Sequence, residues 1–334
     1  PLTTYISQTM KAATITRPGG PEVLEIRDAP IPEPTSGKVL VRVHAFSINR
    51  ADLLQCRGAY PAPQGWPQDI PGLEYAGVVE STGSGVEHVS VGDRVMGIVG
   101  GGSYAEYVVT PANHAMAIPD GMAFEKAAAI PEAFITAYDA LERVALVSDE
   151  WVLVHAIGSG VGTAVVQLAK VRGAKCIGTS RTPSKLERAA ELGMDVGVLS
   201  TSEDLASMVR RATGKGAQTA VDLVGGDLFP ETLASLALRG RLVLVGLTAG
   251  RRVDLDLGVL LSKRLRIEGT VLRSRSEDEK TQVTQAFVKT VLPHFSDGRL
   301  KPVVDRGFDL SEVRSALEYM ESNSNFGNVI VRVG

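Results

Sequence analysis

Alternating strand and helix patterns between residues 150 and 272 limit most strongly what this chain can fold into. Short runs rich in Val, Ile and Leu alternate there with stretches of helical periodicity. The expected strands are EWVLVHA, AKCIGTS, VGVLS, AQTAVDLVG, RLVLVGL and LRIEGTVL, and the expected helices span 162–172, 183–192, 202–213 and 228–238. This order predicts a doubly wound α/β fold, in which a parallel sheet with right-handed crossovers carries helices on both faces.

The residues before this segment have a different texture. Residues 1–125 are rich in Gly and Pro, and the runs KVLVRVHAFSI, EYAGVVESTG, DRVMGIV and SYAEYVV indicate short strands between long loops. Further along, 277–297 is predicted as one long helix and NVIVRVG as a final strand. Because such a strand commonly returns to the first domain, we expect a β-rich domain of residues 1–130 plus 299–334, split by an inserted α/β domain of residues 131–298.

Composition argues against several function classes. The formal net charge is −3 and the Lys and Arg residues are scattered, which argues against a nucleic-acid partner. No apolar run approaches the roughly 18 residues that span a bilayer, and no secretory signal pattern is found, so we expect a cytoplasmic protein without a membrane partner. The two cysteines and five histidines lack the spacing of metal ligands, so no metal is expected.

A glycine-rich turn joins the first strand of the alternating segment to its first helix. Gly158, Gly160 and Gly162 lie at alternate positions in VLVHAIGSGVGTAVVQLAKVRGA, residues 152–174, and depart from the spacing G-x-G-x-x-G. On spacing alone the stretch could be an ordinary tight turn. Its position between a strand and a helix lets backbone N–H groups approach a pyrophosphate at the positive end of the helix. We therefore predict a Rossmann-type dinucleotide site.

The end of the second strand distinguishes between two nicotinamide cofactors. NAD-binding units place Asp or Glu there to accept a hydrogen bond from the ribose 2′-OH. Here the strand ends in TSRT, Lys185 follows, and the first acid is Glu187. Ser180, Arg181 and Lys185 could contact a 2′-phosphate, which favours NADPH. Alternatively, Arg181 and Lys185 are solvated residues at the start of a helix.

Residues that follow the later strands of the alternating segment are further candidates for contact with the cofactor. In open α/β sheets, ligands bind at the carboxyl ends of the strands. Gly225 follows the strand AQTAVDLV, and Gly246 and Leu247 follow RLVLV. Leu272 and Arg273 follow the sixth strand and are expected near the nicotinamide half of the cofactor. Arg273 could equally form an ion pair at a domain interface.

Eight motifs together give the chain a family resemblance: MKAATITRPGGPEVLEI, NRADLLQCRGAYP, IPGLEYAGVV, VGDRVMGI, AAAIPEAFITAYDAL, VLVHAIGSGVGTAVVQLAK, DLVGG and NFGNVIV. In this order, and across essentially the whole chain, they resemble the zinc-independent quinone oxidoreductases of the medium-chain dehydrogenase/reductase superfamily. Within that family, IPEAFITAY, GTVLRSRSEDEK and VLPHF are most similar to the tumour-suppressor-inducible type, which uses NADPH. The resemblance implies a GroES-like fold for the β-rich domain.

The resemblance also implies roles for individual residues. Asn49 and Thr136 would line the nicotinamide, and Tyr60 would face the acceptor and donate a hydrogen bond or a proton to it. Ser159 would bring a hydroxyl close to the cofactor, so the catalytic candidates are Tyr60, Asn49 and Ser159. The cofactor would further contact Gly160, Val161, Gly162, Ser200 and Asn325. Tyr60 could instead be a packing aromatic residue, and Asn49 an ordinary turn residue.

Two further expectations come from the family. The resemblance implies that Asn49 or one of its neighbours stands where zinc-dependent relatives carry Cys, and that Leu73-Glu74 stands where they carry His-Glu, so no catalytic zinc is expected. Relatives dimerise by continuing one sheet across two nucleotide-binding domains. RLRIEGTVL is a candidate for that edge, and a homodimer or a dimer of dimers is expected.

The sequence thus predicts a zinc-free, NADPH-dependent quinone reductase, with hydride passing from nicotinamide to a quinone. Two alternatives stay open. The chain could be an NADPH-dependent reductase of activated C=C bonds, in 2-enals or enoyl thioesters. It could also be an NADPH-binding redox sensor without turnover, against which the presence of Asn49, Tyr60 and Thr136 argues.

Overall fold

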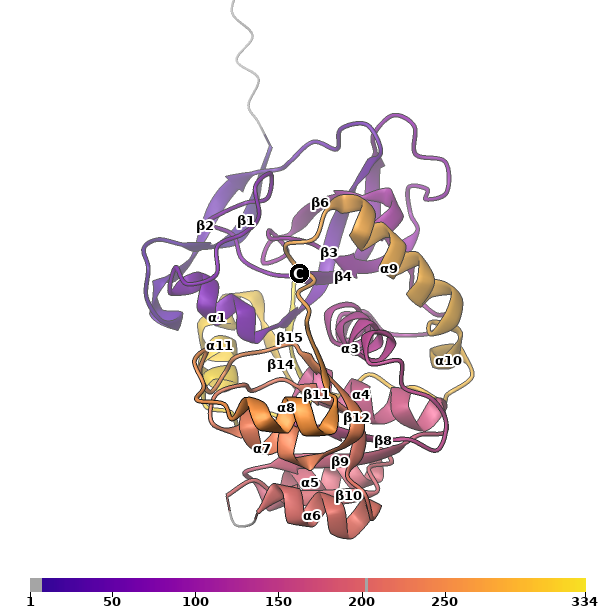
Figure 1. Cartoon of the computed structure of the whole chain (residues 1–334). Helices are drawn as coiled ribbons and strands as arrows, with labels where there is room; N and C mark the ends of the chain where they lie inside the picture. Colours follow the sequence, from indigo (N-terminus) through magenta and orange to yellow (C-terminus); the bar gives the residue numbers. More distant parts are fainter. Residues whose placement is uncertain (1–7, 202–203) are drawn as a thin grey trace, which may run out of the picture. The chain divides into compact units, whose positions relative to one another are not determined.

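The computed structural model describes residues 8–201 and 204–334, which form two compact units (Figure 1). Of the described residues, unit 1 contains 8–132, Arg273–Ser296 and Pro302–Gly334. Unit 2 contains residues Ala133–Leu272 and Asp297–Lys301. Each unit has its own sheet and its own core, and each is described by itself.

Unit 2 is built on a six-stranded sheet in which every neighbouring pair is parallel. Its strands are β8 (Trp151–Val154), β9 (Lys175–Ser180), β10 (Val196–Leu199), β11 (Ala217–Asp222), β12 (Leu236–Leu244) and β13 (Arg266–Gly269). Their order is β10-β9-β8-β11-β12-β13, so the direction of winding reverses after β10. This is the doubly wound order of a Rossmann fold, and it confirms the predicted fold class.

Helices follow the strands of this sheet, as the alternation predicts. They are α3 (Pro131–Arg143), which ends in this unit, α4 (Gly160–Val171), α5 (Pro183–Glu191), α6 (Leu205–Thr213), α7 (Leu228–Ser235) and α8 (Leu257–Lys263). Leu205, Val209, Phe229 and Leu233 of α6 and α7 pack on β-strand side chains in one core cluster. Right-handed crossovers place α4 and α5 on the opposite face.

Two helices differ from their predicted extent. The predicted helix 228–238 ends at Ser235, because β12 starts at Leu236 and pairs there with Ala217. The predicted single helix 277–297 is two helices, α9 (Glu277–Thr290) and α10 (Pro293–Ser296). Pro293 lacks a backbone N–H and its ring collides with the preceding turn, which ends the first helix. The first two residues of the predicted helix 202–213 lie outside the described residues, and α6 starts after Asp204.

Unit 1 contains a seven-stranded sheet and a separate hairpin. The hairpin pairs β1 (Thr9–Ile15) with β2 (Leu24–Pro30). The sheet consists of β3 (Lys38–Ile48), β4 (Glu74–Thr82), β5 (Arg94–Ile98), β6 (Tyr107–Pro111), β7 (Met116–Ala117), β14 (Val304–Asp309) and β15 (Asn328–Arg332). The C-terminal strand β15 pairs with β3, so the chain returns to the β-rich unit at its end, as expected.

Helices and 3₁₀ turns cover this sheet. The helices are α1 (Arg50–Cys56), α2 (Phe124–Ala127) and α11 (Val313–Glu321), and the 3₁₀ turns are Pro21–Val23, Ala112–His114 and Leu310–Glu312. The core contains Phe46 and Tyr104, whose rings stack with their centroids 4.3 Å apart.

Residues 273–296, which the sequence places in the α/β domain, group with the β-rich unit. Their side chains and backbone bond to its loops. The imidazole of His114 bonds through Nε2 to Thr281 Oγ1 at 3.0 Å, and Gln285 Nε2 donates to Asn113 O at 2.9 Å. Helix α9 is therefore part of unit 1.

Candidate active site

The glycine loop of unit 2 is held in one conformation by its own polar groups. Ala156 adopts a left-handed backbone conformation with φ of 50°, and Ile157 N donates to Thr179 O at 3.0 Å. Ser159 is the N-cap of α4, and its hydroxyl accepts from Gly162 N at 3.0 Å. A Cβ on Gly162 would lie 2.5 Å from Ala156 O and 2.7 Å from Ile157 O. Only glycine lets the helix start this close to the strand.

This loop fits a dinucleotide pyrophosphate. The N–H groups in the first turn of an α-helix have no intrahelical acceptor, and Ser159 uses only that of Gly162. The N–H groups of Gly160 and Val161 are therefore available at the positive end of a 12-residue helix. Ser159, Gly160, Val161 and Gly162 thus lie together, in an arrangement suited to their predicted role.

His155, at the end of β8, is a fully buried polar residue that the sequence analysis did not single out. The Thr232 hydroxyl donates its hydrogen to Leu228 O at 2.7 Å, so it accepts from His155 Nε2 at 2.7 Å. Nδ1 then accepts from the Thr179 hydroxyl at 2.9 Å. Burial lowers the pKa of His155, although the charge of Asp222 opposes this. The imidazole is thus neutral, and it joins β8, β9 and α7.

Asp222, at the end of β11, shapes the next loop of the unit. Its Oδ1 accepts from Val224 N at 2.8 Å and from Gly225 N at 2.9 Å. Its Oδ2 is buried and has no partner in the described part of the chain. The hydroxyl of Thr136 on α3 is likewise buried without a partner there. Such atoms are rare in folded proteins, and both belong to the unit expected to bind the cofactor.

The predicted 2′-phosphate residues lie at the end of β9. Ser180 is buried, and its hydroxyl accepts from Thr182 N at 3.0 Å, which fixes the turn into α5. Arg181 is exposed and Lys185 is half-buried in the first turn of α5. Ser200, after β10, donates its backbone N–H to Ser180 O at 3.0 Å. The structure therefore brings the four residues to one region of the sheet edge.

The other predicted residues of unit 2 also follow strand ends. Gly225 has φ of 65°, and a Cβ there would lie 2.9 Å from Leu247 Cδ2. Gly246 donates its N–H to Asp222 O at 3.3 Å, and Leu247 is 48% exposed. Leu272 is buried near the end of the unit.

In unit 1, Glu74 links two other candidate elements. Its Oε1 accepts from Asn49 Nδ2 at 2.8 Å, and its Oε2 accepts from Glu132 N, in the first turn of α3, at 2.8 Å. Burial raises the pKa of Glu74 to about 8, the charge of Glu132 adds to this, and the two hydrogen bonds oppose it. Asn49, the N-cap of α1, therefore has its side chain fixed by a carboxyl group.

Asp52 is a second buried acid in this unit. Its Oδ2 accepts from Asn49 N at 2.7 Å and from the Tyr104 hydroxyl at 2.6 Å. Burial raises its pKa to about 6, although these hydrogen bonds act in the opposite direction. Burial also raises the pKa of Glu132, to about 7, with a further contribution from the charge of Asp52. Unit 1 thus holds three carboxyl groups that titrate near neutral pH.

Arg273 binds to the loop that carries Tyr60. Its Nη1 donates to Tyr60 O at 3.0 Å, its Nε donates to Gly100 O at 2.9 Å, and its Nη2 bonds to Gln55 Oε1. The guanidinium also lies over the Tyr60 ring, 5.0 Å from its centroid. Burial raises the pKa of Tyr60, which keeps its hydroxyl protonated and able to donate. Arg273 therefore positions Tyr60.

Asn325 lies in unit 1 as well, in the turn before β15. Its Nδ2 donates to Gly327 O at 2.8 Å, and Gly327 has φ of 86°. Both Asn325 and the turn are largely buried. The side chain of Asn325 is therefore used to hold this turn.

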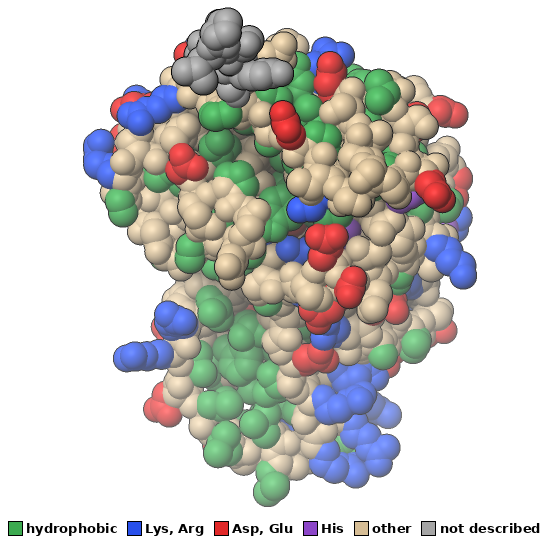
Figure 2. Space-filling view, turned by 90° about the horizontal axis from the view of Figure 1, so that it is seen from above, with side chains coloured by type: hydrophobic (Ala, Val, Ile, Leu, Met, Phe, Trp, Pro, Cys, Tyr) green, Lys and Arg blue, Asp and Glu red, His purple; other side chains and the backbone are tan. Residues whose placement is uncertain are grey.

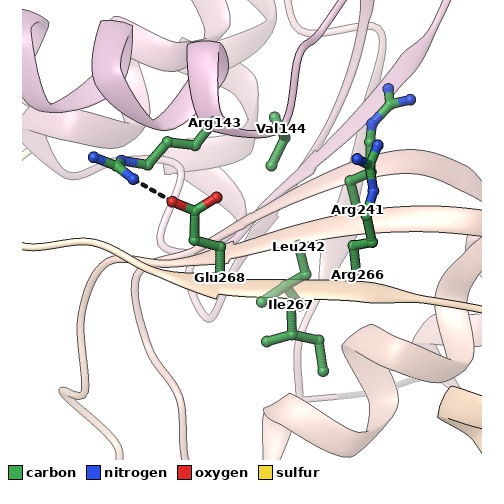
Figure 3. Close-up of a pocket in the computed structure, with 7 residues that line it drawn as sticks. All are labelled: Arg143, Val144, Arg241, Leu242, Arg266, Ile267 and Glu268. Carbon is green, nitrogen blue, oxygen red and sulfur yellow. Dashed lines mark hydrogen bonds and ion pairs between the residues drawn. The ribbon is translucent and has the colours of Figure 1, made fainter.

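A pocket of about 300 Å³ opens at the β13 edge of the unit 2 sheet (Figure 3). It is lined by Arg143, Val144, Arg241, Leu242, Arg266, Ile267 and Glu268. Two of these lining residues, Arg143 and Glu268, form an ion pair with each other, as Figure 3 shows. None of the predicted site residues lines this pocket, so we assign it no part in cofactor binding.

The described residues contain no group of three or more His, Cys, Asp or Glu side chains placed to hold a metal ion. In the same part of the chain, no helix is both long and apolar enough to cross a membrane. On the face in Figure 2, basic side chains lie beside acidic ones, with apolar side chains exposed between them.

The sequence reasoning missed several residues of these sites, and three of them leave a signal. Glu132 is the only charged residue between Lys126 and Asp139. His155 and Asp222 interrupt the apolar strands WVLV and AV at their ends. Polar residues in such runs indicate a buried polar network. Lys280 gives no signal, since it lies in the charged run SEDEK.

Both units match families of known proteins. Residues 160–289 match the family described as zinc-binding dehydrogenase, and residues 35–120 match the alcohol dehydrogenase GroES-like domain. A quinone oxidoreductase of Pseudomonas aeruginosa is 33% identical over 94% of this chain and 96% of its own length. Quinone oxidoreductase-like protein 2 of Bos taurus is 33% identical over 88% of this chain and 84% of its own.

Solved structures agree with this placement. An NAD-dependent alcohol dehydrogenase superposes with a TM-score of 0.88, at 33% identity over 97% of this chain and 100% of its own. A mycobacterial protein complexed with NADPH superposes with a TM-score of 0.86, at 30% identity over 97% of this chain and 99% of its own.

The fold and the strand-end site define a nicotinamide-dependent oxidoreductase with a GroES-like domain. The chain belongs to the medium-chain dehydrogenase/reductase superfamily, and its relatives there include quinone oxidoreductases. The family description mentions zinc, but the donor set does not fit it. Asn49 is bonded to Glu74, and the neighbouring Leu73 offers no ligand atom.

Proposed function

We propose that this chain is an NADPH-dependent quinone reductase of the zinc-independent type, acting in the cytoplasm. Two named relatives, at 33% identity, are a quinone oxidoreductase and a quinone oxidoreductase-like protein. The observation that carries the cofactor choice is the end of β9, where Ser180, Arg181 and Lys185 stand and an acid is absent. The similarity to the tumour-suppressor-inducible type stays a prediction.

The residues of unit 2 would hold the cofactor as follows. The N–H groups of Gly160 and Val161 would bind the pyrophosphate, and Ser159 would support them. Ser180, Arg181 and Lys185 would bind the 2′-phosphate, with Ser200 beside them. The further residues predicted to contact the cofactor are Thr136, Gly225, Gly246, Leu247, Leu272, Asn49, Arg273 and Asn325.

A bound dihydronicotinamide would supply the two electrons and the hydrogen nucleus as hydride. The chain itself must hold the acceptor, exclude water and stabilise the oxyanion that forms on it. Tyr60 keeps its proton near neutral pH, so its hydroxyl can donate a hydrogen bond to that oxygen. The remaining proton would come from Tyr60 or from solvent.

We also propose that two copies of the chain form a homodimer at the β13 edge. Two such dimers could associate into a dimer of dimers. Edge strands present unpaired backbone groups, and all four residues of β13 are exposed. On α8, Leu257 is 66% and Leu261 is 83% exposed. If two copies paired antiparallel about Ile267, Arg266 of each would face Glu268 of the other.

The function is tested by NADPH consumption with ortho-quinones, para-quinones, 2-enals and enoyl thioesters, each repeated with NADH and with a chelator. Quinones should be the best acceptors, and the chelator should have no effect. Faster turnover of an enal or enoyl thioester would replace the quinone assignment by the C=C reductase. Turnover of no acceptor would favour a redox sensor.

The cofactor assignment needs a separate variant. Ser180→Ala combined with Lys185→Ala should raise KM for NADPH at least tenfold and leave KM for NADH nearly unchanged, because only NADPH carries the 2′-phosphate. Lys170→Ala, on an exposed position of α4, is the control. An equal effect on both cofactors would refute the assignment.

A further inference from the structure

Lys280 is a buried lysine with no carboxylate partner among the described residues. It lies in the second turn of α9 and is 5% exposed, and no carboxylate within 4.0 Å and no hydrogen bond of its ammonium is found in the described part of the chain. Its Nζ lies 5.8 Å from the centroid of the Trp66 ring. Burial lowers its pKa and the charge of Arg273 adds to this, while Glu132 and Glu277 oppose it. An ammonium held in this way is costly unless it binds something.

Glu132 is a candidate for the proton donor, and its negative charge acts on Lys280. It is partly exposed, and its carboxyl oxygens have no bonding partner in the described residues, although its backbone N–H is held by Glu74. The negative charges of Asp52 and the positive charges of Arg273 and Lys280 act on it in opposite directions. Its pKa of about 7 means that both the acid and the carboxylate are populated near neutral pH.

Trp66 lies beside Lys280, and Tyr60 lies beside Arg273 in the same unit. Trp66 is partly exposed and packs on Gly100, where a Cβ would lie 2.6 Å from the indole Cδ1. The carbonyl of Gly100 accepts from Arg273, whose guanidinium lies over Tyr60. Gln68 Nε2 donates to Trp66 O at 3.0 Å and closes the loop. Trp66 and Tyr60 are thus fixed by backbone contacts, as a rigid stacking surface requires.

We propose that Lys280 and Glu132 form the subsite for the carbonyl oxygen of a planar conjugated acceptor that stacks on Trp66. Lys280 donates a hydrogen bond to this oxygen, and Glu132 supplies the proton. The inference rests on the proposed reductase function and replaces the undefined proton source there. Tyr60 keeps its hydrogen bond to the acceptor.

The step balances in atoms and electrons. Hydride brings two electrons and one hydrogen nucleus to the quinone, and the negative charge collects on the oxygen beside Lys280. The O–H bond of the Glu132 carboxylic acid breaks, and a new O–H bond forms on the acceptor, which becomes a hydroquinone. The Glu132 carboxylate would then take a proton from water, and oxidation of a bound dihydronicotinamide would supply the two electrons.

The binding part can be tested without cofactor or turnover. The full chain is titrated with 4-nitrophenol, whose phenolate is a coloured planar oxyanion, and binding is followed by absorbance and by quenching of tryptophan fluorescence. The apparent pKa of the bound phenol should fall by about one unit, because an ammonium favours the charged form. Lys280→Met should weaken phenolate binding at least tenfold, and Lys280→Arg should retain most of it.

A matched control excludes a general charge effect. Lys289→Met removes an exposed ammonium from the same helix and should bind the phenolate like the native chain. Lys280→Met should also raise the midpoint of thermal unfolding, because it removes a buried charge, whereas loss of a structural contact would lower it. Unchanged phenolate binding in Lys280→Met would overturn the inference.

The proton role of Glu132 is tested by a pH profile with a quinone. In the native chain kcat should fall above about pH 7 as the carboxyl ionises, and in Glu132→Gln it should be at least tenfold lower and flat in that range. The same profile in both would overturn this role. If the native chain reduces no quinone, the proposed function fails, while the phenolate titration still decides whether Lys280 binds an oxyanion.

Discussion

Replacement of Glu74 by Gln gives the sharpest test of the buried acid network. The variant keeps the size of the side chain and removes its ability to ionise. One of the two hydrogen bonds, from Asn49 Nδ2 or from Glu132 N, then meets an amide NH₂ in place of an oxygen. Asn49 can rotate its amide and present its oxygen, so the network can adapt.

The expected change in the free energy of unfolding follows from the pKa of Glu74. This pKa is about 8 in the folded chain, against an ordinary value of 4.5. At about 1.36 kcal/mol per pH unit, this interval corresponds to about 5 kcal/mol. The folded state binds the proton more tightly than the unfolded state. The contribution of Glu74 to stability is therefore fully present below pH 4.5 and is lost progressively as the pH rises to about 8.

Because Glu132 raises the pKa of Glu74 and itself titrates at about 7, the two share this energy, and we expect about 2 to 5 kcal/mol for Glu74. The assay is urea unfolding of the native chain and of Glu74→Gln between pH 5 and 9. The native chain should lose stability relative to the variant by that amount. Glu87→Gln, at an exposed carboxylate, is the control. A difference between native chain and Glu74→Gln that stays constant over this range would refute the reasoning.

Three further predictions concern unit 2. Gly162→Ala should lower the free energy of unfolding by about 2 to 4 kcal/mol, because the added Cβ meets two backbone oxygens. It should also abolish tight NADPH binding, measured by calorimetry. A native-like affinity for NADPH would contradict the close approach of the helix to the strand. Ser159→Ala should cost about 1 kcal/mol in urea unfolding through loss of the N-cap, and an unchanged midpoint would argue against the cap. Ile267→Lys should convert the expected dimer to a monomer in sedimentation, and an intact dimer would move the interface elsewhere.

Much of the α/β fold could be predicted because its strands and helices have different periodicities and short turns. The parallel, doubly wound sheet with helices on both faces followed from the alternation alone. The helix 277–297 was predicted too long because Pro293 was given too little weight as a helix breaker. The grouping of 273–296 with unit 1 depends on bonds such as that of Gln285 to Asn113 O, and such distant pairs have no local signature.

The candidate site likewise contains residues that could be predicted from the sequence and residues that could not. Gly162 and Ser180 could be predicted as cofactor contacts because they lie at the ends of consecutive elements. Lys280 and Trp66 lie far apart in the sequence, and only folding brings the ammonium over the indole. The acidity of Glu132 could not be predicted either, because it depends on burial and on Asp52.

The hydroxyl and imidazole chain through Thr179, His155 and Thr232 has a consequence for evolution. Each hydrogen in it has one donor and one acceptor. Loss of any one of the three side chains leaves a buried polar atom unpaired, which costs about 1 to 3 kcal/mol, whereas their joint replacement by apolar residues of similar shape can be nearly neutral. Among related sequences, positions 155, 179 and 232 should therefore change together, and single replacements should be rare.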